Sequence, residues 1–365
     1  MGFSRVRFFQ FRNLLDQEVT LDGADEVFLV GENGQGKTNF LEALYFLCYG
    51  TSFRTKNEKN LVSREHQEAS LFGEFRRGSD VQSVGVKLTR SEKILEWNGQ
   101  PVKDRKEMVR AFPCVAFTHE DYQFIQGTPE HQRFFFDQAL SMYNVLYIDA
   151  LRQYKKILRT RNFLLNSSGD SVSLRIWEEK LVQTGLQLMG EREKIVKEFN
   201  EIFPKIFSKV SGIDSDCLIT YSPSWKEQNA DTVVLELEAQ RNQERERGFT
   251  MTGPHRDRYV FRFQGKDFSQ FASTGQVRLL SLLLRVAQAR FAEAKTGKKP
   301  VLLLDDVLLE LDKEKRGMFL QELPSAEQIF FTFLPDENLG SYQAENPLRL
   351  TVVQGRFFKD GKRPH

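Results

Sequence analysis

A complete phosphate-binding loop near the N-terminus constrains this chain more than any other feature. Residues 31–38 read Gly-Glu-Asn-Gly-Gln-Gly-Lys-Thr, which fits the pattern G-x-x-x-x-G-K-[ST]. A short apolar segment at residues 27–30 precedes the loop, and a helical pattern begins at Asn39. A glycine-rich turn with a chance lysine would lack these flanks, whereas strand, loop and helix together are typical of nucleotide-binding proteins. The sequence therefore predicts that the chain binds a nucleoside triphosphate.

Different groups of the loop are expected to bind the phosphates of ATP and its Mg²⁺ ion. Backbone N–H groups of the loop and of the following helix start can surround the phosphate oxygens. Lys37 brings a positive charge to the β and γ oxygens, and the Thr38 hydroxyl can ligate Mg²⁺. We therefore expect ATP to contact the whole loop, namely Gly31, Glu32, Asn33, Gly34, Gln35, Gly36, Lys37 and Thr38.

An apolar segment late in the chain predicts the second half of the site. Residues 301–304 are Val-Leu-Leu-Leu and lead into Asp305 and Asp306. A buried strand would bring Asp305 beside the phosphates, as a Mg²⁺ ligand together with Thr38. Asp306 is then placed to orient or deprotonate an attacking water. An apolar strand that ends in an acid is a weak signal alone, but with the phosphate loop it predicts a catalytic set of Lys37, Asp305 and Asp306.

A short polar motif precedes this strand. Residues 273–276 read Ser-Thr-Gly-Gln at the start of a helical pattern that runs to about residue 292. In isolation such a motif is a helix N-cap with a turn glycine. Its position resembles the signature motif of ATP-binding-cassette ATPases, and residues 309–312 resemble their D-loop. The resemblance implies that Ser273, Gly275 and Gln276 reach the nucleotide of another copy, so that ATP closes a homodimer.

Hydrophobic periodicity predicts an α/β fold with a helical middle. Residues 129–207 read as two long helices that turn back on each other near residues 166–171. Leu181, Leu188, Ile195 and Ile202 recur every seven residues, which fits core-facing helices at least as well as a short coiled-coil arm. Strands are expected at residues 4–9, 18–21, 26–30, 217–221, 232–237, 259–263, 301–304, 329–333 and 348–353, with an antiparallel set at 69–97 and a further helix at 312–322.

These elements combine into one predicted fold class. We expect an ABC-type P-loop ATPase head built from both ends of the chain, with a mainly helical inserted lobe. The 365 residues are too many for a single core, because single cores stop growing near ~250–300 residues. The ATPase lobe is expected at residues 1–125 and 213–365, and the helical lobe at residues 126–212.

Composition limits the location and the partners. The 52 basic and 50 acidic residues give a net charge of +2, so any DNA contact has to come from local patches. The three cysteines are scattered, which argues against a disulfide framework or a zinc site. The N-terminal segment lacks the apolar core of a signal peptide, and no apolar run reaches membrane-spanning length. We expect a cytoplasmic protein without a membrane partner.

Several blocks of sequence are more specific than the ATPase motifs, and they resemble the RecF family of bacterial recombinational repair. They occur in the family's order at residues 34–43, 49–55, 117–121, 127–137, 252–257, 273–278 and 302–312. The resemblance implies a DNA-binding ATP-driven dimer clamp at single-strand/duplex gaps, which works with RecR and RecO to promote RecA loading and supports the SOS response. We also expect slow hydrolysis stimulated by DNA, because Asp306 is one methylene shorter than the glutamate of fast cassette ATPases.

Four positions depart from that family pattern. Arg258 stands where a second acid usually follows, and Gln132 precedes Arg133 where the family often has paired arginines. His119 stands before the acids where the family has a proline, and Leu309 replaces the D-loop serine. These departures indicate a divergent member of the family, in which the D-loop contact across a dimer is the least secure.

Two other classes of ATPase share the nucleotide motifs. A transporter subunit carries a switch histidine after the strand at residues 329–333, where this chain has Thr332. An ATPase of the SMC type requires arms of several hundred residues between Lys37 and Ser273, and here the interval is 273 − 37 = 236 residues. The sequence favours the RecF-like DNA-binding ATPase over both.

The residues that contact DNA are the least constrained by the sequence. Arg54 and Lys56 follow the first helix and are the preferred candidates, because they lie one helix from the nucleotide. Each basic cluster is also typical of a solvated face. The other clusters are Lys103, Arg105 and Lys106, then Lys155, Lys156, Arg159 and Arg161, and finally Arg356, Lys359, Lys362 and Arg363. His255 and Arg256 could line the active cleft or hold a turn, and both interpretations stay open.

Overall fold

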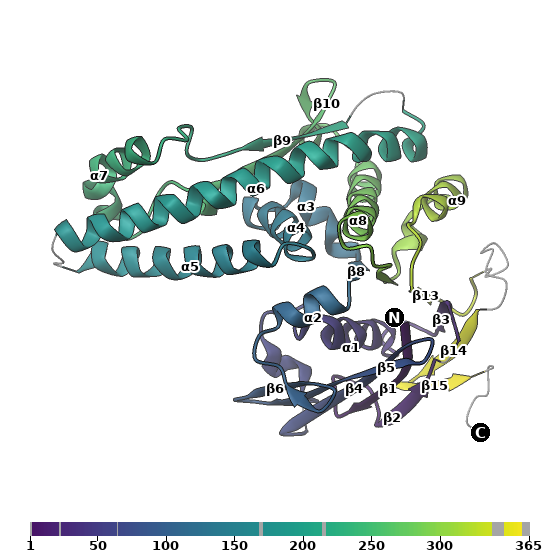
Figure 1. Cartoon of the computed structure of the whole chain (residues 1–365). Coiled ribbons are helices and arrows are strands. Elements are labelled where there is room, and N and C mark those ends of the chain that lie inside the picture. The colour runs from purple at the N-terminus through teal and green to yellow at the C-terminus, as the bar shows by residue number, and fades with distance from the viewer. Residues whose placement is uncertain are drawn as a thin grey trace. The chain divides into compact units, whose positions relative to one another are not determined.

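The computed structural model describes residues 2–21, 23–63, 65–167, 171–213, 217–337 and 347–359. The chain divides into two compact units (Figure 1). Unit 1 comprises residues 1–120 and 288–365, and unit 2 comprises residues 121–287. Unit 1 is therefore built from both ends of the chain, as the sequence predicts.

One six-stranded sheet of unit 1 carries the predicted nucleotide motifs. Its strands lie in the order β15-β14-β3-β13-β12-β8, and all neighbours are parallel except β14 and β15. The strands are β3 (Glu26–Val30), β8 (Cys114–Phe117), β12 (Val301–Leu304), β13 (Gln328–Phe333), β14 (Leu348–Val353) and β15 (Arg356–Lys359). Because β13 pairs in parallel with both β3 and β12, the carboxyl ends of those two strands lie at the same edge of the sheet. This topology brings residues 31–38 and Asp305 together.

A second, antiparallel sheet completes unit 1. Its order is β2-β1-β4-β5-β6-β7, formed by β1 (Gly2–Phe9), β2 (Gln17–Thr20), β4 (Glu68–Arg77), β5 (Asp80–Thr89), β6 (Lys93–Trp97) and β7 (Gln100–Pro101). Helix α1 (Lys37–Tyr49) contacts strands of both sheets, and from Phe40 to Tyr49 every residue is buried. A helix that is buried on all sides and mostly apolar is expected in such a central position, and Glu42 is the charged exception within its buried stretch. Shorter helical segments are α2 (Lys106–Ala111), α9 (Lys313–Glu322), η1 (Glu58–Leu61) and η5 (Val307–Glu310).

Long helices dominate unit 2. They are α4 (Pro129–Ser141), α5 (Val145–Asn166), α6 (Ser171–Ser211) and α7 (Ala230–Arg247), with the short α3 (Gln123–Gln126) and the segment η3 (Pro254–Arg256). A small sheet consists of β9 (Cys217–Ser222), β10 (Arg258–Phe263) and β11 (Lys266–Asp267), followed by η4 (Phe268–Gln270). The unit ends inside α8 (Thr274–Thr296), while η2 (His119–Tyr122) spans its beginning.

The heptad stripe of α6 faces the core of unit 2. Leu181, Leu188 and Ile195 are fully buried, and α6 contacts α5, α7 and β9 along its length. The stripe is therefore that of core-facing helices, although Ile202, its last predicted residue, is only half-buried.

Figure 1 shows α5 running back along α6, as the sequence predicts. The described part of residues 129–207 nevertheless contains three helices instead of the two predicted, because α4 ends and Asn144 caps a new helix, α5. The predicted turn between α5 and α6 falls partly on residues 168–170, which lie outside the described part of the chain.

Two predictions about this region differ from the structure. Residues 232–237 form a turn of α7 instead of a strand, because Asn229 caps the helix by accepting a hydrogen bond from the Thr232 N–H, and Val233, Val234 and Leu237 are buried on one helical face. Unit 2 also extends beyond the predicted 126–212 lobe to residue 287. The added residues include β9 and α7, which both contact α6. Among the described helices, none is long and apolar enough to cross a membrane.

Candidate nucleotide site

The loop at residues 31–38 connects β3 to α1, and its glycines meet local steric demands. A Cβ atom on Gly31 would lie 2.4 Å from the Val352 carbonyl oxygen, so the neighbouring strand leaves room for glycine alone. Gly34 and Gly36 have φ of 79° and 111°, a region that other residues rarely adopt. The G-x-x-x-x-G spacing is therefore required by the path of the backbone itself.

Neighbouring segments hold this loop through its acceptors. The backbone N–H of Gly355 donates to the Gln35 carbonyl at 2.8 Å, and that of Gln354 donates to the Gln35 Oε1 at 2.5 Å. On the other side Asn13 Nδ2 donates to the Gly34 carbonyl at 2.9 Å. In these three contacts the loop supplies acceptors only. The Gly31 N–H donates to the Phe333 carbonyl at 3.1 Å, so the N–H donors left for an anion are those further along the loop.

Lys37 and Thr38 lie at the start of α1 and point to the groups expected of them. Lys37 is 4% exposed, and its ammonium donates to the carbonyls of Gly31 at 2.6 Å and Glu32 at 3.2 Å. The Thr38 hydroxyl donates to Asp305 Oδ1 at 2.8 Å. The two predicted Mg²⁺ ligands, 267 residues apart in sequence, are thus in direct contact.

The electrostatic setting of Asp305 is unusual for a carboxyl group. Burial raises its pKa to about 6, and the neighbouring charge of Asp306 adds to this effect. The Thr38 hydrogen bond, and then Arg54 and His119, act in the opposite direction. A divalent cation beside Asp305 would favour the ionised form, so the raised pKa describes a carboxylate that needs a cation.

Thr332 holds the second acid, Asp306, by two hydrogen bonds. In the sequence this threonine stands out only because a transporter ATPase has its switch histidine at this point. Asp306 has φ of 55° and ψ of 11°, a left-handed conformation that glycine adopts readily and other residues adopt only occasionally. Thr332 Oγ1 accepts a hydrogen bond from the Asp306 N–H and donates to Asp306 Oδ1, both at 2.7 Å. Since β12 and β13 are adjacent parallel strands, a hydroxyl near the end of β13 could have been expected to meet the acid after β12.

Most of these residues surround one cavity of about 260 Å³, although the predicted site residues Gly31, Glu32, Gln35 and Asp305 are not among those that line it. Its lining includes loop residues, Asp306 and Arg54; the complete set is Asn13, Asn33, Gly34, Gly36, Lys37, Thr38, Asn39, Arg54 and Asp306. Arg54 Nη1 donates to Asn39 Oδ1 at 2.8 Å. The two preferred DNA candidates are therefore separated, because Arg54 lines the cavity and the exposed Lys56 does not. Sequence reasoning missed Asn13, which carries no motif signal, and gave no role to Asn39, which lies in the RecF-like block at residues 34–43.

The donor set fits ATP with Mg²⁺. A hydroxyl and a carboxylate are the hard oxygen ligands that Mg²⁺ prefers, and the cation usually takes only one or two such protein ligands beside phosphate oxygens and water. Within the described ranges no three His, Cys, Asp or Glu side chains are grouped to hold a metal by themselves. Thr38 and Asp305 are therefore the residues that would hold Mg²⁺ at this site.

The predicted signature motif belongs to unit 2 and forms a capping box. The Ser273 N–H donates to Gln276 Oε1 at 2.9 Å, and the Gln276 N–H donates to Ser273 Oγ at 3.3 Å. This reciprocal pair satisfies free donors at the start of α8. Residues 273–276 are all exposed. The capping interpretation is thus observed, and the exposed motif stays available to a second copy.

A second RecF-like block, residues 252–257, forms the centre of a buried ion-pair network, here called the Arg192 network. Arg192 is 2% exposed and pairs with Asp257 at 2.9 Å and Asp137 at 2.8 Å. Asp257 also accepts hydrogen bonds from the Tyr221 hydroxyl at 2.5 Å and the Ser224 N–H at 2.8 Å. The network ties η3 and β10 to α4 and α6.

His255 in this block has a structural role. Its Nδ1 lies 2.8 Å from the Tyr154 hydroxyl and its Nε2 lies 3.0 Å from the Thr250 carbonyl. Burial lowers its pKa to about 4, so the ring stays neutral near pH 7. Arg256 stacks on the Phe249 ring at 4.9 Å. Among the other basic candidates Arg161 is not a solvated residue, because it is fully buried against Glu178 and Glu244; Lys362 and Arg363 lie outside the described residues.

Comparisons with known proteins agree with this geometry. The family model described as the RecF/RecN/SMC N terminal domain matches residues 3–356. A curated relative, the DNA replication and repair protein RecF of Treponema pallidum, is 39% identical over 94% of this chain and 97% of its own length. A solved structure of the recombination mediator protein RecF with ATP, from the RecFOR pathway, superposes with a TM-score of 0.89 at 27% identity, over 98% of this chain and 97% of that one.

The same comparisons confirm the predicted fold class. An Smc head bound to the C-winged helix domain of ScpA matches with a TM-score of 0.57 at 14% identity, over 98% of this chain and 97% of that chain. At that identity the likeness concerns the fold alone, which is the SMC-type head of an ABC ATPase. The relationship at higher identity is to RecF proteins over nearly their full length. The chain therefore belongs to the RecF family of DNA replication and repair proteins.

Proposed function

We propose that this chain is a DNA-binding ATPase of recombinational repair, in which ATP closes a homodimer on DNA. The observation that carries the proposal is the contact of Thr38 with Asp305, at 2.8 Å, beside a complete phosphate loop and a cavity of about 260 Å³. Two distant parts of the sequence meet there in the arrangement that Mg²⁺ and triphosphate require. ATP and Mg²⁺ are the proposed cofactors.

The proposed roles of the residues follow from their contacts. Lys37 exchanges its loop carbonyls for the β and γ phosphate oxygens, and the loop N–H groups beyond Gly31 bind the phosphates. Thr38 and Asp305 would hold Mg²⁺, which would supply charge neutralisation for the phosphates. Asp306, fixed by Thr332, orients the attacking water. The short aspartate side chain favours slow hydrolysis, so that bound ATP acts as a switch.

Dimer closure would use the exposed start of α8. Ser273, Gly275 and Gln276 present a hydroxyl and a helix N-terminus, which together suit the γ-phosphate held by a second copy. Leu309, at the D-loop position, has 42% of its surface exposed. An exposed leucine supplies apolar contact area in place of the serine hydroxyl, so the interface would be less polar at this point.

The biological setting is proposed from the family. The related RecF with a known structure is described as a recombination mediator of the RecFOR pathway. For this chain we propose the cytoplasm as its location and action at single-strand/duplex gaps. RecR and RecO would be its partners there, in RecA loading and in support of the SOS response. Arg54 and Lys56 remain the proposed DNA contacts of the predicted set. The transporter-type and SMC-like alternatives share the nucleotide motifs, and the likeness to RecF relatives at 39% and 32% identity favours the RecF-like function over both.

The mass of the particle tests the clamp. We expect the wild-type chain to double in mass by light scattering when ATP and Mg²⁺ are added, and gapped duplex to stabilise the dimer. Asp306→Asn, which keeps the Thr332 hydrogen-bonding shape, should accumulate the dimer because hydrolysis is blocked. Lys37→Ala serves as the control that binds no ATP and stays monomeric. A monomeric Asp306→Asn variant at saturating ATP and Mg²⁺ would contradict the clamp.

A further inference from the structure

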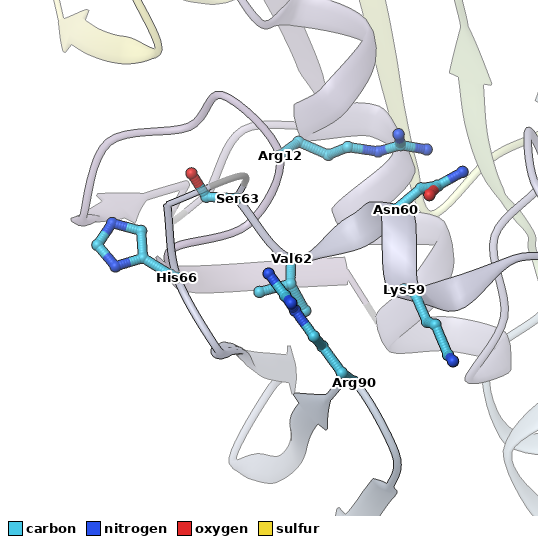
Figure 2. A pocket seen from close by; sticks show the side chains of 7 residues that line it. All are labelled: Arg12, Lys59, Asn60, Val62, Ser63, His66 and Arg90. Carbon is cyan, nitrogen blue, oxygen red and sulfur yellow. The ribbon is translucent and has the colours of Figure 1, made fainter.

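A second cavity of unit 1 is lined mainly by basic and polar residues. Its volume is about 710 Å³, and Figure 2 shows the side chains that line it, namely Arg12, Lys59, Asn60, Val62, Ser63, His66 and Arg90. None of the described residues in this lining is acidic. We call it the Lys59–Arg90 cavity, and no sequence motif pointed to it.

The wall of this cavity is held in an unusual backbone conformation. Gln10 and Arg12 have φ of 50° and 57°, although neither is a glycine. The Ser63 N–H donates to the Gln10 carbonyl and the Arg12 N–H donates to the Leu61 carbonyl, both at 2.8 Å, while Phe11 bridges to Val62. Such strained residues persist where the surroundings fix them, and they gather at functional sites.

Two cations of the cavity lack the partners that their neighbours have. Lys87 pairs with Glu68 at 3.1 Å, and Lys93 pairs with Glu58 at 2.5 Å. Lys59 and Arg90 are exposed, and their side chains make no ion pair within the described part of unit 1. Unpaired cations around a cavity without acids form a site for an anion.

A chain of contacts links this cavity to the nucleotide cavity. Arg12 donates through Nε and Nη2 to the Glu42 carboxylate at 2.9 and 2.8 Å. Glu42 is fully buried and lies 3.6 Å from Arg54 Nη1, which itself lines the nucleotide cavity. Ser52 Oγ donates to Glu42 Oε1 at 2.5 Å. One buried carboxylate is thus shared by an arginine from each cavity.

We propose that the Lys59–Arg90 cavity binds backbone phosphates of nucleic acid, and that Arg12 and Glu42 transmit this binding to Arg54. The inference rests on the proposed function in taking DNA as the partner. A phosphate beside Arg12 competes with Glu42 for the guanidinium, and Glu42 then draws Arg54 more strongly. The position of Arg54 in the nucleotide cavity therefore depends on whether DNA is bound, and by linkage ATP affects DNA affinity equally.

Exposed lysine and arginine side chains along an open cavity suit backbone phosphates, which are contacted without regard to base sequence. The test of the site compares Lys59→Gln/Arg90→Gln with Lys87→Gln/Arg76→Gln, which removes the same charge from strands β5 and β4 of the same unit, outside the cavity. Affinity of the full chain with ATP for a labelled gapped duplex is measured over a salt series. Loss of two phosphate contacts should weaken binding about tenfold or more and reduce the salt slope by about 2. The control variant should match the wild type.

The outcomes separate this inference from the proposed function. If the wild type binds no DNA in any nucleotide state, the proposed function fails. If the wild type binds DNA and the Lys59→Gln/Arg90→Gln variant has the same affinity and slope, only the present inference fails. If inorganic phosphate raises the melting temperature through Lys59 and Arg90 while DNA affinity is unchanged, the cavity serves a free anion and the inference is also overturned.

A separate variant tests the transmission. Arg12→Lys keeps the charge in the cavity but cannot give Glu42 two parallel donors. We expect it to bind DNA within about threefold of the wild type, while DNA no longer alters ATP affinity or turnover. The near-isosteric Glu42→Gln should show the same loss, and it provides a second reading if Arg12→Lys is unstable. Undiminished stimulation by DNA in both folded variants would exclude the path through Glu42.

Discussion

The nucleotide cavity of unit 1 and the Arg192 network of unit 2 both lie on family-specific sequence blocks, yet they use their charges in opposite ways. In the network Arg192 faces two carboxylates, and Asp257 takes further hydrogen bonds from Tyr221 and Ser224. Each charge there is matched by protein groups. In the nucleotide cavity Lys37 has only backbone carbonyls as partners. Burial raises the pKa of Asp257 as well as that of Asp305, but Asp257 has the counter-charge of Arg192 whereas Asp305 is next to the like charge of Asp306.

The difference distinguishes a sequence motif whose residues maintain the fold from one whose residues bind a ligand. Charges that pair with each other inside the protein are costly to separate, and they are not available to bind a ligand. Charges held by weak partners around a cavity remain available to one. His255 and Asp305 illustrate the contrast, because burial keeps His255 neutral inside a complete hydrogen-bond set and leaves Asp305 in need of a cation.

The largest effect is expected from breaking the Arg192 network. Arg192→Met leaves Asp137 and Asp257 without their counter-charge, and removing one partner of a buried ion pair costs about 3–5 kcal/mol. Urea unfolding should show this loss, whereas Arg262→Met on the exposed face of β10 should change the unfolding free energy by less than about 0.5 kcal/mol. A loss below about 1 kcal/mol for Arg192→Met would mean that the network is not the centre of unit 2.

The nucleotide cavity should respond in binding instead of stability. Lys37→Met removes the charged donor to the phosphates, and we expect about 100-fold weaker ATP binding, which corresponds to about 3 kcal/mol. The unfolding free energy should change by no more than about 1 kcal/mol. Titration with a fluorescent ATP analogue measures the first quantity. Lys56→Met is the matched control, because Lys56 does not line the cavity; if both variants bound ATP alike, the assignment of Lys37 would be wrong.

Acid should act on the two regions with opposite sign. The folded pKa of His255, about 4, lies below its ordinary 6.5, so its contribution to stability is lost as pH falls below about 6.5, by about 1–2 kcal/mol at pH 5. The folded pKa of Asp305, about 6, lies above its ordinary 3.8. The destabilisation that comes from burying the ionised Asp305 carboxylate is therefore relieved as pH falls from 6 to 5, by about 1 kcal/mol of unfolding free energy.

Unfolding at pH 7, 6 and 5 separates these contributions. The His255→Gln variant should lose less stability in acid than the wild type, and the Asp305→Asn variant should lose more. Because Mg²⁺ needs the ionised carboxylate, Mg²⁺-dependent ATP binding by the wild type should weaken up to about tenfold between pH 6 and pH 5. If the unfolding free energies of all three proteins changed equally with pH, the opposite acid responses assigned to His255 and Asp305 would be wrong.

The sequence predicted best what local patterns encode. The phosphate loop and the strand at residues 301–304 have distinctive spacing, and the structure brings Thr38 and Asp305 together as expected. The strand predicted at residues 232–237 was wrong, because a capping contact from Asn229 and burial at helical spacing outweigh the β-branched residues there. The limits of unit 2 also depend on long-range packing against α6, which no local pattern reports.

Residues that act through tertiary neighbours were beyond the sequence. Thr332 gains its position from the parallel pairing of β12 and β13, and Arg12 gains its position from a strained turn that pairs with residues 61–63. Arg161, counted among basic surface candidates, is buried because Glu178 and Glu244 converge on it from two other helices. In each case the deciding partner lies far away in sequence.

The smallest predicted effect tests the comparison most directly, because in both regions a side-chain hydroxyl donates a hydrogen bond to an aspartate. Thr332→Val and Tyr221→Phe each remove one hydroxyl from an aspartate, the half-buried Asp306 and the buried Asp257 respectively. Each should cost about 1 kcal/mol of unfolding free energy. Only Thr332→Val should slow ATP turnover, about tenfold with ATP affinity unchanged, because Asp306 loses the contact that orients it; Thr332→Ser should retain the rate. Equal turnover in the Val and Phe variants would mean that the Thr332 hydroxyl has only a structural role, like that of Tyr221. In that case the contrast between the two regions would apply to Asp305 and not to Asp306.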